Sequence, residues 1–138
     1  MRRILLVIIG LSTTLFADFS RTGDIVTDTT TGLQWQDNEV VARNWSGAID
    51  YCETLSFDGH DDWRLPNIKE LTSLVDDSKI NPAIKHGVFQ YADVGDDWSS
   101  TTNMDSNNSA WYVPFDRGYQ RIGNKSDGYY VRCVRAGE

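Results

Sequence analysis

The stretch Asp62-Trp63-Arg64-Leu65-Pro66-Asn67-Ile68-Lys69-Glu70-Leu71 carries the clearest structural signal in this chain of 138 residues. Asn67 and Glu70 have the spacing of a capping box, in which each side chain accepts a hydrogen bond from the backbone N–H of the other residue. A helix is therefore predicted to begin after Asn67. Its expected apolar residues are Ile68, Leu71, Leu74 and Val75. We expect Arg64, just before this helix, to pair with a carboxylate from a loop.

Periodic patterns on both sides of this stretch predict an α+β domain. Residues 25–36 predict a hairpin with its turn at Asp28–Gly32. Apolar residues recur at helical spacing from Trp45, with Asn44 as the N-cap and Cys52 facing inward. Strand-like runs follow at residues 98–101, 110–115, 119–122 and 129–135. Two early helices followed by a series of strands are typical of the α+β class.

The first seventeen residues have the pattern of a secretory signal peptide. Arg2 and Arg3 precede an apolar run from Ile4 to Phe16, and Ala17 is a small residue that suits a cleavage site. A membrane anchor is the weaker interpretation, because spanning a bilayer takes about 20 apolar residues. We expect cleavage after Ala17 and an exported domain of residues 18–138, periplasmic or extracellular, with no membrane span.

The charge balance argues against a nucleic-acid partner. The chain has 13 Lys and Arg against 20 Asp and Glu, and losing Arg2 and Arg3 with the signal peptide changes the net charge from −7 to −9. Nucleic-acid binding needs clustered cations that replace the counterions of phosphates. The five Trp and six Tyr residues suit either a core of large rings or a surface that stacks on sugars.

Cys52 and Cys133 are the only cysteines of the chain. Two cysteines in one small exported domain predict a disulfide bond. Such a bridge closes a loop of about 80 residues and contributes about 4 kcal/mol in the chain-entropy model. The cysteines lack CxxC spacing, and His60 and His86 lie far apart, so we expect neither a zinc site nor a thiol redox centre.

Six separated motifs carry a family resemblance. They are Thr31–Gln36, Trp45–Cys52, Asp62–Leu71, Trp98–Thr101, Ala110–Val113 and Tyr130–Arg135. In content and order they resemble the Lcl C-terminal domain family, named after the last domain of a collagen-like adhesin of Legionella. The resemblance covers nearly all of residues 18–138. It implies a C-type-lectin-like fold, with two helices flanking antiparallel sheets and with the chain ends close together.

A polar segment and a basic segment supply candidate ligand-binding residues. Amide and carboxylate oxygens of the first can bind sugar hydroxyls or coordinate calcium, although a solvated loop is the simpler interpretation. The second gathers cations between residues 117 and 135. The candidates are Asn103, Asp105, Asn107, Asn108, Arg117 and Arg121. No lectin calcium motif supports a calcium site, because Leu65-Pro66-Asn67 lies at a helix start and Trp98 is followed by Ser99-Ser100. We therefore expect no cofactor, and the sequence leaves the metal question open.

Other conspicuous side chains have structural interpretations. We expect Trp98 and Trp111 to fill the core, and Arg132 and Arg135 to be exposed on a strand. Adjacent carboxylates are expected to be solvated. These pairs are Asp61-Asp62, Asp76-Asp77 and Asp96-Asp97.

Three classes of function remain. The favoured one is an exported, non-catalytic module that binds a glycan or a surface protein, and a structural or assembly domain of the cell envelope is the alternative. Arg64–Asn67 and Arg132–Arg135 are also similar to motifs of the formylglycine-generating enzyme family. That chemistry needs reactive cysteines, whereas Cys52 and Cys133 are assigned to a bridge, so no catalytic residues are expected. The oligomeric state is left open.

Overall fold

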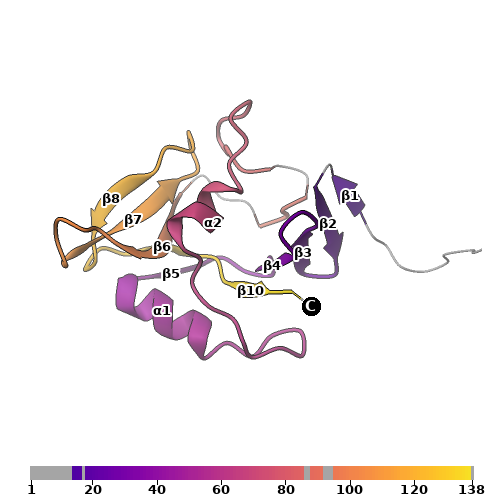
Figure 1. The fold of residues 1–138 in the computed structure, drawn as a ribbon, viewed down its shortest axis with the longest axis horizontal. Coiled ribbons are helices and arrows are strands. Elements are labelled where there is room, and N and C mark those ends of the chain that lie inside the picture. Colours follow the sequence, from indigo (N-terminus) through magenta and orange to yellow (C-terminus); the bar gives the residue numbers. More distant parts are fainter. Residues whose placement is uncertain (1–13, 17, 86–87, 92–94, 138) are drawn as a thin grey trace, which may run out of the picture.

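A computed structural model describes residues 14–16, 18–85, 88–91 and 95–137, and its elements confirm the α+β class. Figure 1 shows two sheets at opposite ends of the domain, with one helix near the middle and the other below one of the sheets. In spatial order, the first sheet contains β1 (Thr14–Phe16), β2 (Phe19–Thr22), β3 (Ile25–Asp28), β4 (Leu33–Gln36) and β10 (Val134–Ala136). The second contains β5 (Val41–Arg43), β9 (Tyr129–Val131), β6 (Asp96–Thr102), β7 (Ser109–Pro114) and β8 (Arg121–Asn124). The helices of the described residues are α1 (Trp45–Glu53) and α2 (Ile68–Thr72).

The predicted hairpin is confirmed as β3 and β4. The Asp28 carboxylate accepts a hydrogen bond from the Thr30 N–H at 2.9 Å, and the Asp28 carbonyl accepts one from the Gly32 N–H at 2.8 Å. Gly32 has a φ of +78°, a backbone conformation that glycine adopts without strain. A short acidic side chain and a glycine thus explain the turn.

The N-terminal strand β1 belongs to the predicted signal peptide. It pairs antiparallel with β2, in a register that places Leu15 opposite Ser20. The rest of the predicted signal peptide, including Ala17, lies outside the described residues. Within the described part of the chain, we find no helix long and apolar enough to cross a membrane.

The single strand predicted for residues 129–135 is wrong, because this segment divides between the two sheets. β9 pairs with β5 and β6, whereas β10 pairs with β4, where Val134 lies opposite Trp35. The β6–β9 pair is parallel, which the expectation of antiparallel sheets did not include. Arg132 and Cys133 form the crossing between the sheets, a change of partner that the alternating pattern of side chains does not reveal.

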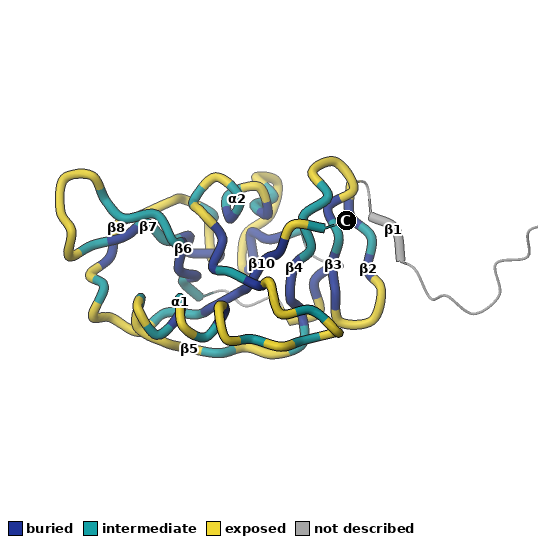
Figure 2. Tube along the Cα trace, turned by 60° about the horizontal axis from the view of Figure 1, so that its bottom comes forward, coloured by how far each residue is buried: buried dark blue, intermediate teal, exposed yellow. Residues whose placement is uncertain are grey.

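Two apolar clusters fill the interior, one on each side of this crossing. The first contains Trp35 and Leu71, and the second contains Trp98 together with both cysteines. Figure 2 shows the buried chain segments gathered in the interior, with exposed segments at the turns. Trp98 is fully buried, as predicted. The prediction that Trp111 fills the core is wrong. Trp111 is only half-buried and lies opposite Ile122, whose exposed fraction is 45%.

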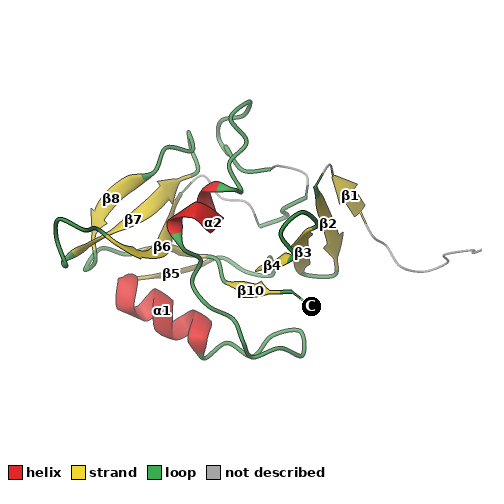
Figure 3. Cartoon of the chain, in the orientation of Figure 1, coloured by secondary structure: helices red, strands yellow, loops and turns green. Residues whose placement is uncertain are grey.

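The capping box at the start of α2 is confirmed. Asn67 Oδ1 accepts from the Glu70 N–H at 2.8 Å, and Glu70 Oε1 accepts from the Asn67 N–H at 2.9 Å. The helix is shorter than predicted and ends at Thr72 (Figure 3). The hydroxyl of Thr72 donates to the Ile68 carbonyl, and that of Ser73 donates to the Glu70 carbonyl. Such bonds compete with helix continuation.

Arg64 pairs with a carboxylate of α2, and not with one from a loop as expected. Its two terminal nitrogens each donate to an oxygen of Glu70 at 2.7 Å. This bidentate bond is the main cause that lowers the pKa of the Glu70 carboxyl. Glu70 therefore serves both the capping box and an ion pair.

Candidate functional site

Two turns and the first residues of α1 enclose a pocket of about 500 Å³. One turn connects β6 to β7 and the other connects β8 to β9. These turns lie side by side because Ser109 pairs with Asn124 across β7 and β8. The residues that line the pocket, named here the Trp45 pocket, are Trp45, Ser46, Asn108, Asn124, Lys125 and Ser126.

Trp45 is held at both its ring and its backbone. The ring Nε1 donates to the Ser99 carbonyl at 2.9 Å, and the backbone N–H donates to the Lys125 carbonyl at 3.1 Å. The Lys125 ammonium lies 3.9 Å from the centroid of the indole ring and donates to the Thr102 hydroxyl at 2.9 Å. A cation over the face of an indole ring is attracted by the ring's electrons. This contact holds the side chains of Lys125 and Trp45 together at the wall of the pocket.

The two turns are also joined to each other. The backbone N–H of Lys125 donates to the Asn108 carbonyl at 2.8 Å. Asn124 Oδ1 accepts from the N–H of Ser126 at 3.0 Å and from its hydroxyl at 2.9 Å. Asparagine stabilises turns through such bonds to its own backbone. Hydrogen bonds within the protein therefore hold the walls of the pocket in place without a ligand.

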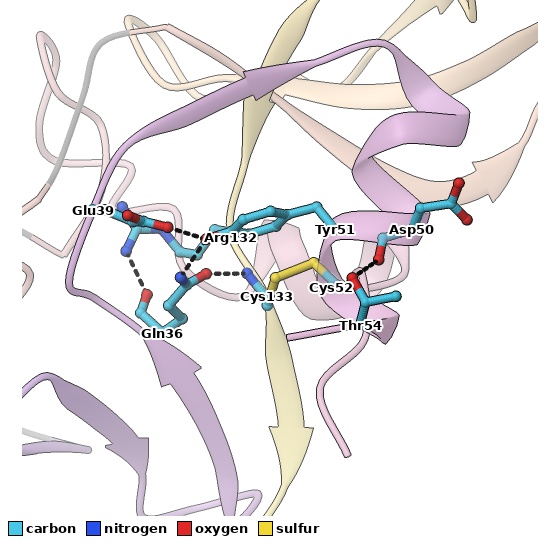
Figure 4. The surroundings of a disulfide bond; sticks show 8 residues. All are labelled: Gln36, Glu39, Asp50, Tyr51, Cys52, Thr54, Arg132 and Cys133. Atoms are coloured by element: carbon cyan, nitrogen blue, oxygen red, sulfur yellow. Dashed lines mark hydrogen bonds between the residues drawn. A yellow bond between two sulfur atoms is a disulfide. The ribbon is translucent and has the colours of Figure 1, made fainter. Parts of the chain in front are cut away.

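The predicted disulfide is confirmed between Cys52 of α1 and Cys133 of the sheet crossing. The two Cα atoms are 5.5 Å apart, and both residues are fully buried. Figure 4 shows Gln36 beside the bridge, where its amide donates to the Tyr51 hydroxyl at 2.9 Å and accepts from the Cys133 N–H at 3.4 Å. Burial and a hydrogen bond to Glu39 raise the pKa of Tyr51 to about 12. Because both sulfur atoms are in the bridge, neither is a thiolate nucleophile.

A second polar group, the Asp37 cluster, lies deep between the sheets. It contains Asp37, Arg21 and Arg132, which are at most 6% exposed. Arg21 donates to one carboxylate oxygen of Asp37, and Arg132 donates to the other at 2.9 Å. The backbone N–H groups of Gln90 and Tyr91 donate to the same carboxylate at 2.8 and 3.1 Å. A buried charge needs such complete pairing.

The expectation of exposed strand arginines is wrong. Arg132 and Arg135 are each 5% exposed, because both lie where the chain crosses into the first sheet. Arg132 lies over the Phe89 ring, 4.8 Å from its centroid. Arg135 Nε donates to Asp62 Oδ1 at 2.6 Å, and this bond lowers the pKa of the Asp62 carboxyl. The expectation that Asp97 is solvated is also wrong, since this residue is only 1% exposed.

One known family model matches most of the chain. The model described as the Lcl C-terminal domain matches residues 24–135. The chain belongs to the Lcl C-terminal domain family. The matched range includes the Asp37–Arg132 pair, both cysteines and the whole Trp45 pocket of this Lcl C-terminal domain. A comparison with curated proteins gives no match.

The predicted polar candidates all lie in the turn between β6 and β7, but they differ in role. Asn108 lines the Trp45 pocket. The Asn103 amide holds the turn together, because its oxygen accepts from the Asp105 N–H and its nitrogen donates to the Ser109 hydroxyl, each at 3.3 Å. Asp105 and Asn107 are exposed and do not line the pocket.

The predicted basic candidates do not join this site. Arg121 starts β8 opposite Tyr112, whereas the pocket residue Asn124 ends the same strand. Arg117 lies in the exposed loop before β8. Since Arg132 and Arg135 are buried in ion pairs, the cations of residues 117–135 do not gather on one face.

Sequence reasoning missed most of the pocket in this Lcl C-terminal domain. The sequence assigns Trp45 and Ser46 only to the start of a helix, groups Lys125 with the cations of residues 117–135, and gives no role to Asn124 or Ser126. The run of Asn, Lys, Ser, Asp and Gly at 124–128 is itself a turn signal. Placing that turn beside Asn108 required the pairing of β7 with β8. Among the described residues, no group of three or more His, Cys, Asp or Glu side chains is placed to hold a metal ion.

Proposed function

We propose that this Lcl C-terminal domain is an exported, non-catalytic carbohydrate-binding module whose Trp45 pocket holds a neutral sugar residue. The observation that carries the proposal is the composition of the pocket. It joins the indole ring of Trp45 to the amides of Asn108 and Asn124 and to the hydroxyls of Ser46 and Ser126. Export rests on the signal-peptide pattern, and the C-type-lectin-like relationship remains a prediction from the resemblance.

The chemistry of the pocket suits a sugar. A sugar presents hydroxyl groups that both donate and accept, and amide side chains can do the same. The indole ring supplies an apolar wall for the C–H face of the sugar ring. A volume of about 500 Å³ lies within the range of small-molecule sites, which is about 300–1,000 Å³.

A metal ion is not needed for this mode of binding. The pocket offers amides, hydroxyls and one ammonium group. Calcium instead takes six to eight oxygen ligands, in which carboxylates are prominent. We therefore expect binding to be the same with calcium and with a chelator.

The charge distribution favours a neutral glycan over a sulfated one. The chain has a net charge of −7, and Arg132 and Arg135 are committed to internal carboxylates. Sulfated polymers bind through clustered surface cations. We expect little or no retention on heparin at physiological salt. Strong retention that is abolished by replacing Arg117 and Arg121 with alanine would show that the local cations outweigh the net charge.

A glycan screen with the folded domain tests the proposal. The variants Asn108→Ala and Asn124→Ala should each weaken binding of the best neutral glycan about tenfold, because each removes a side-chain amide that can form a hydrogen bond with a sugar hydroxyl. Asn107→Ala is the matched control, because Asn107 is an exposed asparagine of the same turn. An equal loss of affinity in all three variants, or an affinity that none of the three changes, would show that the glycan binds elsewhere.

A protein partner is the second candidate, favoured by one observation. Trp111 and Ile122 are paired across β7 and the edge strand β8, and Ile122 is 45% exposed. Exposed apolar pairs on an edge strand are common at contacts between proteins. If a protein binds here, Ile122→Lys should abolish binding while the Asn108 variant has no effect.

A further inference from the structure

A separate pocket of about 280 Å³ lies between the second half of α1 and the segment that leads into α2. Its lining residues, named here the Arg64 pocket, are Ile49, Glu53, Arg64, Leu65, Asn67 and Ser100. None of these residues lines the Trp45 pocket. The two pockets are therefore distinct, although α1 contributes side chains to both.

The helix α1 leads from one pocket to the other. Trp45 and Ile49 are four residues apart, so they lie on the same face of the helix and about 6 Å apart along its axis. Both side chains pack against the second apolar cluster. Glu53 follows four residues after Ile49, at the end of the helix. The Trp45 and Arg64 pockets thus follow each other along one side of α1.

The strand β6, which packs against α1, makes the same connection. The carbonyl of Ser99 accepts from the ring of Trp45 at 2.9 Å, and the next residue, Ser100, lines the Arg64 pocket. Further along the strand, the hydroxyl of Thr102 accepts from the ammonium of Lys125, a residue of the Trp45 pocket. The helix and the strand therefore both run past the two pockets.

The Arg64 pocket offers groups that suit a second sugar. The Arg64 guanidinium has five N–H donors, and Glu70 accepts one hydrogen bond from each of its two terminal nitrogens. The carboxylate of Glu53 accepts hydrogen bonds, and the hydroxyl of Ser100 both donates and accepts. The amide oxygen of Asn67 is committed to the capping box, so we assign it no contact with the ligand.

The surroundings of this pocket disfavour two other kinds of ligand. Glu70 pairs with Arg64, and Glu53 adds a negative charge, so an anionic group is not attracted. An extended peptide binds a sheet by adding a strand to an open edge. In the second sheet, however, β6 lies between β9 and β7 and is not an edge strand. A neutral, hydroxyl-rich ligand fits the pocket better than either.

We propose that the Arg64 pocket binds the sugar next to the one held in the Trp45 pocket, so that the ligand is an unbranched neutral oligosaccharide lying along α1. This inference rests on the proposed function, because it extends the sugar site of the Trp45 pocket. The hydroxyls of the second sugar bind Glu53, Ser100 and the guanidinium of Arg64. A monosaccharide uses the first pocket alone.

A length series tests this extension. The folded domain is titrated, with detection by NMR, with the monosaccharide and the tetrasaccharide of the cello-, malto-, manno-, xylo- and N-acetylchito-oligosaccharide series. In at least one series, we expect the tetrasaccharide to bind at least about tenfold more tightly than the monosaccharide. A single pocket gains no more than about fourfold, because a tetrasaccharide only offers it four units in place of one.

Three variants separate the two pockets. Glu53→Ala should weaken binding of that tetrasaccharide about tenfold and leave binding of the monosaccharide within about twofold, because only the longer ligand reaches Glu53. Asn108→Ala should weaken binding of both ligands, because both occupy the Trp45 pocket. Asp50→Ala is the matched control, since Asp50 is an exposed carboxylate of the same helix that lines neither pocket. It should change neither affinity by more than about twofold.

The NMR signals show which pocket each ligand occupies. The tetrasaccharide should shift both the indole N–H of Trp45 and the methyl groups of Ile49. A shift of Trp45 alone, or an affinity that Glu53→Ala does not change, would overturn the extension and leave the proposed function standing. If no sugar of either length binds, the proposed function fails as well. Displacement of the tetrasaccharide by tetraalanine would assign the Arg64 pocket to an extended peptide and would also overturn the extension.

Discussion

The Asp37 cluster and the Trp45 pocket use similar polar side chains in opposite surroundings. In the cluster, two arginines and one aspartate are withdrawn from water, and both arginines pair with the one carboxylate. In the pocket, amides, hydroxyls and a lysine lie at the meeting of two turns and the start of a helix. Of the cations at residues 117–135, Lys125 lies at the pocket, Arg132 lies in the cluster, and the three other arginines lie in neither. The local density of charge in the sequence therefore does not predict a charged surface.

Removing the carboxylate of Asp37 should have the largest effect on stability. Asp37→Asn leaves the guanidinium groups of Arg21 and Arg132 buried without their shared anion. We expect the free energy of unfolding to fall by about 5 kcal/mol, the upper end for a broken buried ion pair. Urea denaturation measures the loss.

Asp24→Asn is the control for this prediction. Asp24 also pairs with Arg21, at 3.7 Å, but its side chain is 59% exposed. Exposed pairs contribute little, so this variant should change stability by less than about 1 kcal/mol. Similar losses from the two aspartates would contradict the distinction between a buried cluster and a solvated surface.

Removing the disulfide should have the next largest effect, because it ties α1 to the segment that contains Arg132. The double variant Cys52→Ala with Cys133→Ala should lose about 4 kcal/mol of stability in the chain-entropy model. Mass spectrometry of the non-reduced protein should detect no free thiol. Two cysteines that react with alkylating reagent in the native protein would show that the bridge does not form.

The capping box belongs to neither region, and its loss should have a smaller, local effect on stability. Asn67→Ala removes the oxygen that accepts from the Glu70 N–H at 2.8 Å. A lost cap costs about 1 kcal/mol, and we expect this loss in thermal unfolding. Sugar binding at saturating ligand should be unchanged. A variant that is fully stable but does not bind would show Asn67 to be a functional residue.

Loss of the ion pair between Glu70 and Arg64 should have the smallest effect on stability. This effect should depend on pH. The pKa of Glu70 is lowered in the folded state, chiefly by its bond to Arg64. Its contribution is therefore complete above the unfolded pKa of about 4.3 and is lost as the pH falls below it. The Arg64 side chain is 42% exposed, so solvent screening limits the pair to under about 1 kcal/mol.

Denaturation between pH 6 and pH 3 measures this contribution. Glu70→Gln should be less stable than the wild type at pH 6 and should converge with it as the pH falls. Asp77→Asn removes a charge at an exposed position, and its stability should run parallel to that of the wild type over this pH range. A difference for Glu70→Gln that stays constant with pH would mean that the charge of Glu70 does not contribute.

Local signals in the sequence predicted the parts of the fold that are local. Asp28 and Gly32 identified the first hairpin, Asn44 and Asn67 identified both helix starts, and the cysteine count identified the bridge. Apart from the early end of α2, the failures concern contacts between residues far apart in the sequence. Arg132 and Asp37 are 95 residues apart. Their pairing follows from the crossing between sheets and not from any local pattern.

In the candidate site, too, the sequence predicted only what depends on a local signal. Asn108 was found because its segment is rich in polar residues. Its neighbour Lys125 was grouped with the arginines of the basic segment, and its actual contact is the ring of Trp45, far away in the sequence. Three separate segments meet at this pocket, and the composition of each one does not show that it lies beside the other two.

The pairing of β4 with β10 also sets the order in which the domain can be completed. A chain that emerges N-terminus first exposes Trp35 long before its partner Val134 exists. Until residues 132–136 are synthesised, β4 lacks its β10 neighbour, Asp37 lacks Arg132, and Cys52 lacks Cys133. Closing loops of this length is entropically costly and slows folding. The first sheet, the Asp37 cluster and the disulfide are therefore all completed by the same late segment of the chain.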